Sequence, residues 1–243
     1  MRRLFRLFWR RRYDWREGKR GYREEVKQRE GKTGAMGRFV YCNNNNIYSE
    51  QLVLVNASHP YIEEETKEGL YPVHPQAPEI LLKEQAVIHL SALMEEIKGW
   101  EWIVPVSGWR SLREQQDIFD SSLKEKGEEF TRKFVALPGC SEHQTGLAID
   151  LGLKQEKVDF ICPDFPYEGI CQRFRERAAA YGFIERYQKA KEEITGISQE
   201  PWHFRYVGAP HAERMKKYGV CLEEYIEMLG RLSHGRRYDG AGR

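Results

Sequence analysis

The sequence lacks an apolar run long enough to cross a bilayer. A transmembrane helix needs roughly 20 consecutive apolar residues, and no segment approaches that length. A secretory signal needs an uninterrupted apolar stretch of about 7–15 residues behind its basic start. Here Arg6 and the arginines at 10–12 interrupt the apolar residues near the N-terminus. The sequence therefore predicts a cytoplasmic location.

Cysteine is scarce and the net charge is low. The five cysteines among 243 residues show no regular framework, and four lie among apolar residues, where we expect small buried side chains: Cys140, Cys162, Cys171 and Cys221. An oxidising compartment is therefore not required. A net charge of +2 does not indicate nucleic acid as the main partner. The sequence also has no glycine-rich phosphate loop and no G-x-S-x-G motif of a serine hydrolase.

Charged residues are abundant at the N-terminus. Residues 1–46 are dense in arginine, lysine and glutamate, and this composition predicts a flexible extension. Two other interpretations stay open: a basic arm that makes weak contact with an anionic membrane surface, or a translation start further along the chain. We predict one folded domain over residues 47–230 and a flexible tail over residues 231–243.

Helices and strands are expected in mixed order along this domain. The apolar spacing and the end signals predict helices over residues 80–98, 111–126, 167–181, 211–218 and 222–229. The second of these helices should begin at a capping box, Ser111-Leu112-Arg113-Glu114. Strands are predicted at residues 52–55, 102–106, 147–153 and 202–207. Because no β-α-β rhythm links these elements, the predicted class is α+β.

Two segments carry the residue types of a metal site. They are S-E-H-Q-T-G-L-A-I-D at 141–150 and E-P-W-H at 200–203. Together they offer two imidazole nitrogens, a carboxylate and a spare carboxylate. A catalytic zinc site has three protein ligands, one position open to water and a nearby general base. Pro201 excludes a regular helix through the second segment, so helical spacing does not explain it. The predicted chemistry is metal-assisted hydrolysis.

These motifs, together with S-G-W-R-S at 107–111 and E-P-W-H-F-R-Y at 200–206, resemble the zinc D-alanyl-D-alanine peptidases of vancomycin-resistance type. That family includes VanY carboxypeptidases, VanX dipeptidases and bifunctional VanXY enzymes. The likeness also takes in residues 134–140, 161–165 and 193–198. It implies a hedgehog/D,D-peptidase-like fold, in which helices flank a small, mostly antiparallel sheet.

The resemblance implies a role for each residue of the predicted metal site. His143, Asp150 and His203 would bind one zinc ion per chain, and Glu200 would be the general base. Arg110 would polarise the scissile carbonyl, because a guanidinium offers planar and permanently charged donors. Two other interpretations stay open. Glu200 could instead orient His203, and Arg110 could belong to a surface salt bridge.

Three further residues match positions that contact substrate in the family. Ser141 matches a serine that helps to hold the substrate's terminal carboxylate. Gln115 matches a glutamine that orients the active site or the substrate. Trp202 would form a wall of the substrate pocket, although a tryptophan in a strand is more often part of the core.

The activity implied by the resemblance is that of a zinc D,D-carboxypeptidase that could also be a D,D-dipeptidase. It would act on peptidoglycan precursors ending in D-Ala-D-Ala or on the free dipeptide. The implied biology is glycopeptide resistance, because vancomycin-type antibiotics bind that terminus. Two alternatives are a stem-peptide or cross-bridge endopeptidase of the same metal fold and an inactive, zinc-stabilised wall-binding module. The presence of Glu200 and Arg110 argues against the inactive module.

Overall fold

The computed structural model describes residues 50–61 and 66–235. Its main sheet has four strands in the order β3-β4-β6-β5, and every neighbouring pair is antiparallel. These strands are β3 (Ile103–Ser107), β4 (Ala148–Leu153), β6 (Glu200–Tyr206) and β5 (Phe183–Tyr187). A separate antiparallel hairpin is formed by β1 (Leu70–His74) and β2 (Ala77–Lys83). The predicted α+β class with a small antiparallel sheet is confirmed.

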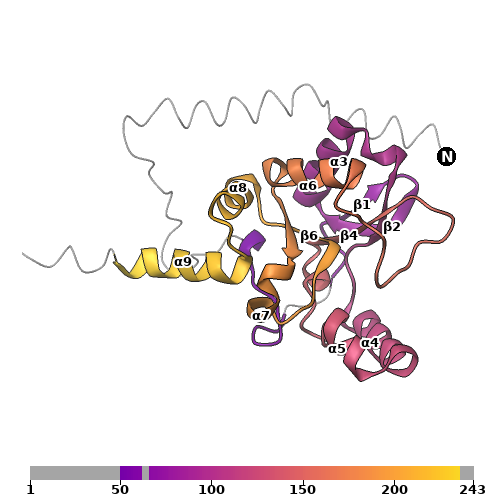
Figure 1. The fold of residues 1–243 in the computed structure, drawn as a ribbon, viewed down its shortest axis with the longest axis horizontal. Helices are drawn as coiled ribbons and strands as arrows, with labels where there is room; N and C mark the ends of the chain where they lie inside the picture. Colours follow the sequence, from indigo (N-terminus) through magenta and orange to yellow (C-terminus); the bar gives the residue numbers. More distant parts are fainter. Residues whose placement is uncertain (1–49, 62–65, 236–243) are drawn as a thin grey trace, which may run out of the picture. The chain divides into compact units, whose positions relative to one another are not determined.

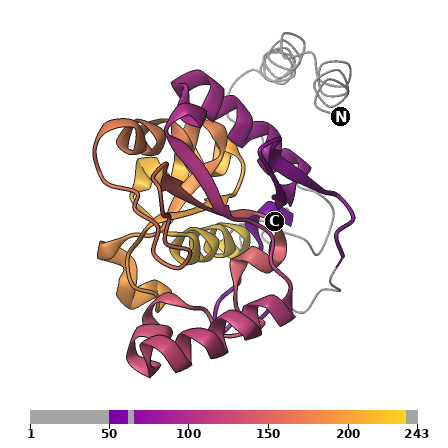
Figure 2. The same cartoon turned by 90° about the vertical axis from the view of Figure 1, so that its right-hand side faces the viewer.

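Helices flank the sheet in two groups that lie apart in both views (Figures 1 and 2). α3 (Glu84–Ile97) packs against α6 (Gly169–Ala178), whereas α4 (Leu112–Lys126) packs against α5 (Glu128–Phe134). After the short α7 (Glu192–Thr195) and strand β6, the chain continues into α8 (Ala209–Tyr218) and α9 (Leu222–Gly235). Short 3-10 turns lie at Glu50–Leu52, Gly99–Glu101, Glu142–Thr145, Ala179–Tyr181 and Lys189–Lys191.

The two central strands are covered on both faces. Residues 148–152 of β4 are all buried, and in β6 only Pro201 is partly exposed. On one side, Phe204 of β6 meets Phe165 and Phe174, with ring centroids 5.5 Å and 4.8 Å away. Central strands held from both sides form the most rigid part of such a fold. Polar side chains that project from β4 and β6 are therefore held in fixed positions.

Several predicted elements agree with the structure. β3, β4 and β6 lie within two residues of the strands predicted at 102–106, 147–153 and 202–207. The capping box of α4 is complete, because the Ser111 hydroxyl accepts from the Glu114 amide while the Glu114 carboxylate accepts from the Ser111 amide. The helix predicted over 167–181 appears as α6 followed by a 3-10 turn, and Gly182 ends it with a φ of 84°.

The strand predicted at 52–55 is wrong. Leu52 ends a 3-10 turn, and the following residues pair with no strand. The run at 52–55 is apolar and partly β-branched, as in a strand, but its buried residues, Leu52 and Val55, are three apart and do not alternate as strand residues do. The nearby carbonyls are bound by a side chain instead of a neighbouring strand, because Arg205 donates to the oxygens of Gln51 and Val53.

The start of the helix predicted over 80–98 is also wrong. Its first four positions belong to β2, where Leu81 and Leu82 pair with β1, and the helix begins at Glu84. A short apolar run fits a buried strand as well as a helix entry, so periodicity alone does not separate them. The helix ends at Ile97, one residue before the predicted end, and Lys98 follows it in the left-handed conformation.

The predicted domain boundaries stay predictions. The extension over 1–46, with its open membrane-contact interpretation, lies outside the described residues. Helix α9 reaches Gly235, which is beyond the predicted start of the C-terminal tail at residue 231. Within the described part of the chain, no helix is both long enough and apolar enough to span a membrane.

Candidate functional site

Asp150 and His203 are direct partners in the ladder between β4 and β6. Residues directly opposite in an antiparallel pair project to the same face of the sheet, with Cβ atoms about 4.5–5.5 Å apart. The Asp150 Oδ1 atom accordingly lies 2.9 Å from His203 Nδ1. The pairing register of two buried strands therefore brings together two side chains that are far apart in the sequence.

His143 reaches the same point from the 3-10 turn that precedes β4. Its Nε2 atom lies 3.0 Å from Asp150 Oδ2, and its Nδ1 atom donates to the Gly108 carbonyl at 2.7 Å. This second contact fixes the proton on Nδ1 and leaves Nε2 to face Asp150. Gly146 ends the turn with a φ of 70°, where a Cβ would lie 2.7 Å from Leu70 Cδ2. The turn that aims His143 thus depends on a glycine.

The three side chains form a donor set that fits a zinc ion. One ligand atom from each of His143, Asp150 and His203 lies within 4.8 Å of the other two, and all three residues are buried. Two imidazole nitrogens with one carboxylate oxygen are ligands that zinc accepts. Although burial opposes it, the two histidines hold the pKa of Asp150 well below its usual range, so this carboxylate stays ionised.

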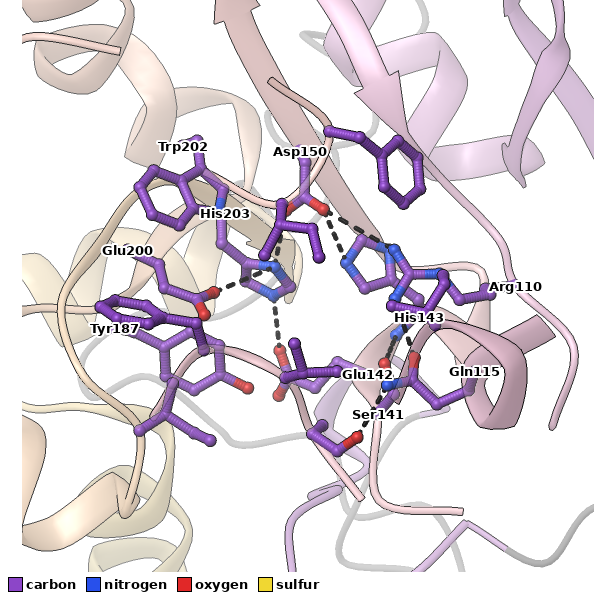
Figure 3. Close-up of a pocket in the computed structure, with 17 residues that line it drawn as sticks. Arg110, Gln115, Ser141, Glu142, His143, Asp150, Tyr187, Glu200, Trp202 and His203 are labelled. Carbon is purple, nitrogen blue, oxygen red and sulfur yellow. Dashed lines mark hydrogen bonds and ion pairs between the residues drawn. The ribbon is translucent and has the colours of Figure 1, made fainter. Parts of the chain in front are cut away.

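The Glu200 side chain lines the same pocket as His203 because the pairing of β6 with β5 is irregular. In a regular strand, residues three apart project to opposite faces. Here Glu185 pairs with Phe204 but Tyr187 pairs with Glu200, so β5 advances two residues while β6 covers four. This irregularity includes Pro201, and it lets the Glu200 carboxylate lie 3.9 Å from His203 Nδ1 (Figure 3). The Glu200 carboxylate therefore lies beside the predicted metal ligands.

The buried carboxyl of Glu200 holds its proton more tightly than an ordinary glutamate does. Burial, opposed by His203, raises the pKa of Glu200 to about 8. A group that accepts a proton and returns it works best when its pKa lies near the working pH. Burial alone would lower the pKa of His203, but hydrogen bonds with Asp150 and Glu142 raise it to about 9.

Arg110 is held in one orientation by two neighbours. Its Nη1 donates to Gln115 Oε1 at 2.8 Å, and its Nη2 donates to Ser107 Oγ at 2.6 Å. The Gln115 amide is itself fixed by its contact with the Ala136 carbonyl at 2.7 Å. The Arg110 backbone amide donates to the His143 carbonyl at 3.2 Å, which ties the guanidinium to the metal-ligand turn. Arg110 thus lines the pocket, and its side chain is only 12% exposed. An arginine in a surface salt bridge would be far more exposed.

The remaining residues predicted to contact substrate also line this pocket: Gln115, Ser141 and Trp202. The Ser141 hydroxyl accepts from the His143 amide at 3.4 Å. Sequence reasoning did not single out Tyr187, whose buried ring lies 4.9 Å from the His203 ring. It comes from β5, which the sequence pattern did not predict. Phe160 and Ile161 also line the pocket; Ile161 begins the 161–165 stretch of the resemblance and Phe160 precedes it.

Known proteins are similar in sequence to this chain over most of the described domain. A family model described as VanY, D-alanyl-D-alanine carboxypeptidase, matches residues 79–209. The bifunctional D-Ala-D-Ala dipeptidase and D-Ala-D-Ala carboxypeptidase VanXYC of Enterococcus gallinarum is 42% identical over 186 residues. The matched part covers 73% of this chain and 94% of that protein.

Two solved structures are similar to this chain in fold as well as in sequence. The vancomycin-resistance D,D-dipeptidase VanXYg, in complex with a D-Ala-D-Ala phosphinate analogue, is 55% identical with a TM-score of 0.72, and the match covers 75% of this chain and 72% of that chain. A mutant of the D,D-pentapeptidase VanY from a VanB-type resistance cassette, in complex with Zn(II), is 31% identical with a TM-score of 0.62. That match covers 73% of this chain and 99% of the other.

Proposed function

The chain belongs to the family of VanY D-alanyl-D-alanine carboxypeptidases, and we propose that it uses one zinc ion to hydrolyse the amide bond between two D-alanine residues. The chain is a D-Ala-D-Ala peptidase of vancomycin-resistance type. The observation that carries the proposal is the convergence of His143, Asp150 and His203 in a pocket that Glu200 and Arg110 also line.

Three protein ligands leave a zinc ion a coordination position for water or substrate. When bound, the ion would polarise the scissile carbonyl and lower the pKa of a water molecule. The family relationship supports zinc, because the VanY structure described above contains Zn(II). The donor atoms of His143, Asp150 and His203 support it independently, because they are buried, close together and chemically suited to the ion.

Glu200 moves the proton in the proposed reaction. Its carboxylate would accept a proton from the attacking water and return it to the nitrogen of the departing D-alanine. The D-alanine then leaves with a protonated amino group and not as a nitrogen anion. Its position near His203 Nδ1 and its raised pKa both support this role. The alternative, in which Glu200 orients His203, has less support, because Glu142 already contacts the other ring nitrogen.

Arg110 stabilises the charge that develops on the carbonyl oxygen. Gln115 and Ser107 take up one nitrogen each of the guanidinium and thereby orient it towards the pocket. Donors that are oriented before the reaction need no rearrangement when negative charge develops. We assign Gln115 to orienting Arg110, since both polar atoms of its amide are already engaged within the protein.

Ser141 and Trp202 contribute to substrate binding in this proposal. The Ser141 hydroxyl would donate to the terminal carboxylate of the substrate, and Trp202 would pack against it. Both side chains line the pocket beside the metal-ligating residues. Removing the terminal D-alanine also removes the group that vancomycin-type antibiotics bind, and this consequence links the activity to glycopeptide resistance.

The release of D-alanine from two peptides tests this function. The full-length zinc-loaded chain should release D-alanine from D-Ala-D-Ala and from a muramyl-type pentapeptide that ends in D-Ala-D-Ala. A pentapeptide ending in L-Ala-L-Ala is the matched control and should stay intact. Cleavage inside the stem without D-alanine release would indicate the endopeptidase alternative. Binding of either peptide without turnover would indicate the inactive module.

A further inference from the structure

A fully buried carboxylate, that of Glu142, contacts the edge of the His203 ring opposite the edge that Asp150 contacts. Its Oε2 atom lies 3.4 Å from His203 Nε2, whereas Asp150 lies 2.9 Å from His203 Nδ1. Figure 3 shows the ring between these two carboxylates. The Glu142 side chain has no exposed area.

Two arginines hold Glu142 in place. Arg186 Nε donates to Glu142 Oε1 at 2.9 Å, and Arg205 Nη1 lies 2.9 Å from the same oxygen. Arg186 comes from β5, while Arg205 follows His203 by two residues in β6 and projects to the same face. Both guanidinium groups are fully buried. The carboxylate therefore has one oxygen committed to arginines and one oxygen left for His203.

Buried ion clusters of this kind stabilise a fold only weakly, because desolvation offsets most of the attraction between the charges. Stability alone is thus a poor reason for placing two arginines and a glutamate in the core. Contact with His203 gives the cluster a more specific use. A histidine ligand coordinates through one nitrogen, and a hydrogen bond from its other nitrogen sets the tautomer and the ring orientation.

We propose that Glu142 is a positioning residue, which keeps the remaining proton of His203 on Nε2 so that Nδ1 is the nitrogen that binds the metal. His143 is set in the complementary way, because its Nδ1 donates to the Gly108 carbonyl and its Nε2 faces Asp150. Each histidine thus presents a defined nitrogen to the shared site. The inference rests on the metal site of the proposed function and adds the residues that prepare it.

Glu142→Gln tests the inference because an amide cannot satisfy three donors. Its single oxygen can accept from the arginines or from His203. We expect it to face the arginines, because they are permanently charged donors and lie closer than His203. The amide NH2 would then face His203 Nε2 and favour the tautomer with the proton on Nδ1, which blocks coordination. Loss of such a supporting hydrogen bond typically lowers metal affinity by about 10–100-fold. We expect a loss in this range when zinc binding is measured by competition with a chromophoric chelator.

Glu223→Gln is the matched control. Glu223 accepts from Arg186 Nη2 at 2.6 Å and from the Asn56 amide at 3.3 Å, but it makes no contact with His203. Both variants remove one carboxylate charge from the same cluster, so both should lower the melting temperature of the metal-free protein. Only Glu142→Gln should weaken zinc binding. Equal zinc affinities in Glu142→Gln and the wild type, or equal losses in both variants, would overturn the inference.

If Glu142→Gln does not fold, Glu142→Asp replaces it in the same comparison. Aspartate keeps the charge that the arginines require, but it is one methylene too short to reach His203 as well. The same loss of zinc affinity relative to Glu223→Gln is expected. A wild-type chain that binds no zinc would refute the metal site itself. A wild type that binds zinc no more tightly than the Glu142 variant would refute only the positioning role.

Discussion

Replacing Glu200 with glutamine should remove most of the turnover and leave zinc bound. The three predicted ligands are unchanged, but the amide cannot accept a proton from water. General acid–base catalysis contributes typically about 10²–10⁴ in rate, so kcat should fall by a factor in this range. The measurement is D-alanine release from D-Ala-D-Ala under saturating conditions, with the zinc content of each preparation determined alongside.

Glu193→Gln serves as the control for this variant. Glu193 is an exposed glutamate of α7 outside the pocket, so the same chemical change there should leave kcat unaltered. Near-normal turnover of Glu200→Gln with zinc bound would assign Glu200 to orienting His203. Loss of zinc from Glu200→Gln would instead make Glu200 a further contributor to the metal site.

Replacing Arg110 with lysine should be damaging although the charge is kept. Lysine cannot donate to Gln115 and Ser107 while also facing the carbonyl oxygen, because it lacks the planar fork of a guanidinium. The buried Gln115 oxygen would also lose its partner. A donor to a developing oxyanion is typically worth about 10²–10³ in rate. We expect the loss mainly in kcat, since the interaction strengthens in the transition state.

Arg113→Lys is the matched change for Arg110→Lys. Arg113 lies on the exposed side of α4, three residues away in the sequence, and it does not line the pocket. Its replacement should alter neither kcat nor KM. An Arg110→Lys effect confined to KM would indicate that Arg110 binds the substrate in its ground state. Unchanged kinetics would return Arg110 to the salt-bridge interpretation.

The sequence identified the main candidate residues of the site because each lies in a short local motif. Asp150 was correctly expected on a buried strand, and Pro201 correctly excluded a helix between Glu200 and His203. The sequence could not show that Asp150 and His203 are opposite each other, because strand register depends on long-range pairing. It also could not show the irregularity in β6 that brings Glu200 to the same pocket.

The contacts that hold Glu142 beside His203 could not be predicted from the sequence, for a different physical reason. Glu142 stands next to a ligand in the chain, yet a glutamate in a loop is normally solvated. Its burial depends on Arg186 and Arg205, which come from two neighbouring strands. Arg205 lies in the E-P-W-H-F-R-Y motif, but nothing in the sequence shows that either arginine contacts Glu142. In the same way, no local pattern shows that Arg205 takes the place of a strand partner for the carbonyls of Gln51 and Val53.

The most direct test of the central claim is the zinc content of Asp150→Asn beside the wild type. Both full-length proteins are dialysed against the same weak chelator, checked for folding by circular dichroism and analysed for metal. The wild type should retain one zinc ion per chain. Asp150→Asn should retain almost none, because a neutral amide is a poor replacement for the only carboxylate among the proposed ligands. A folded Asp150→Asn protein with a full complement of zinc would contradict the proposed metal site.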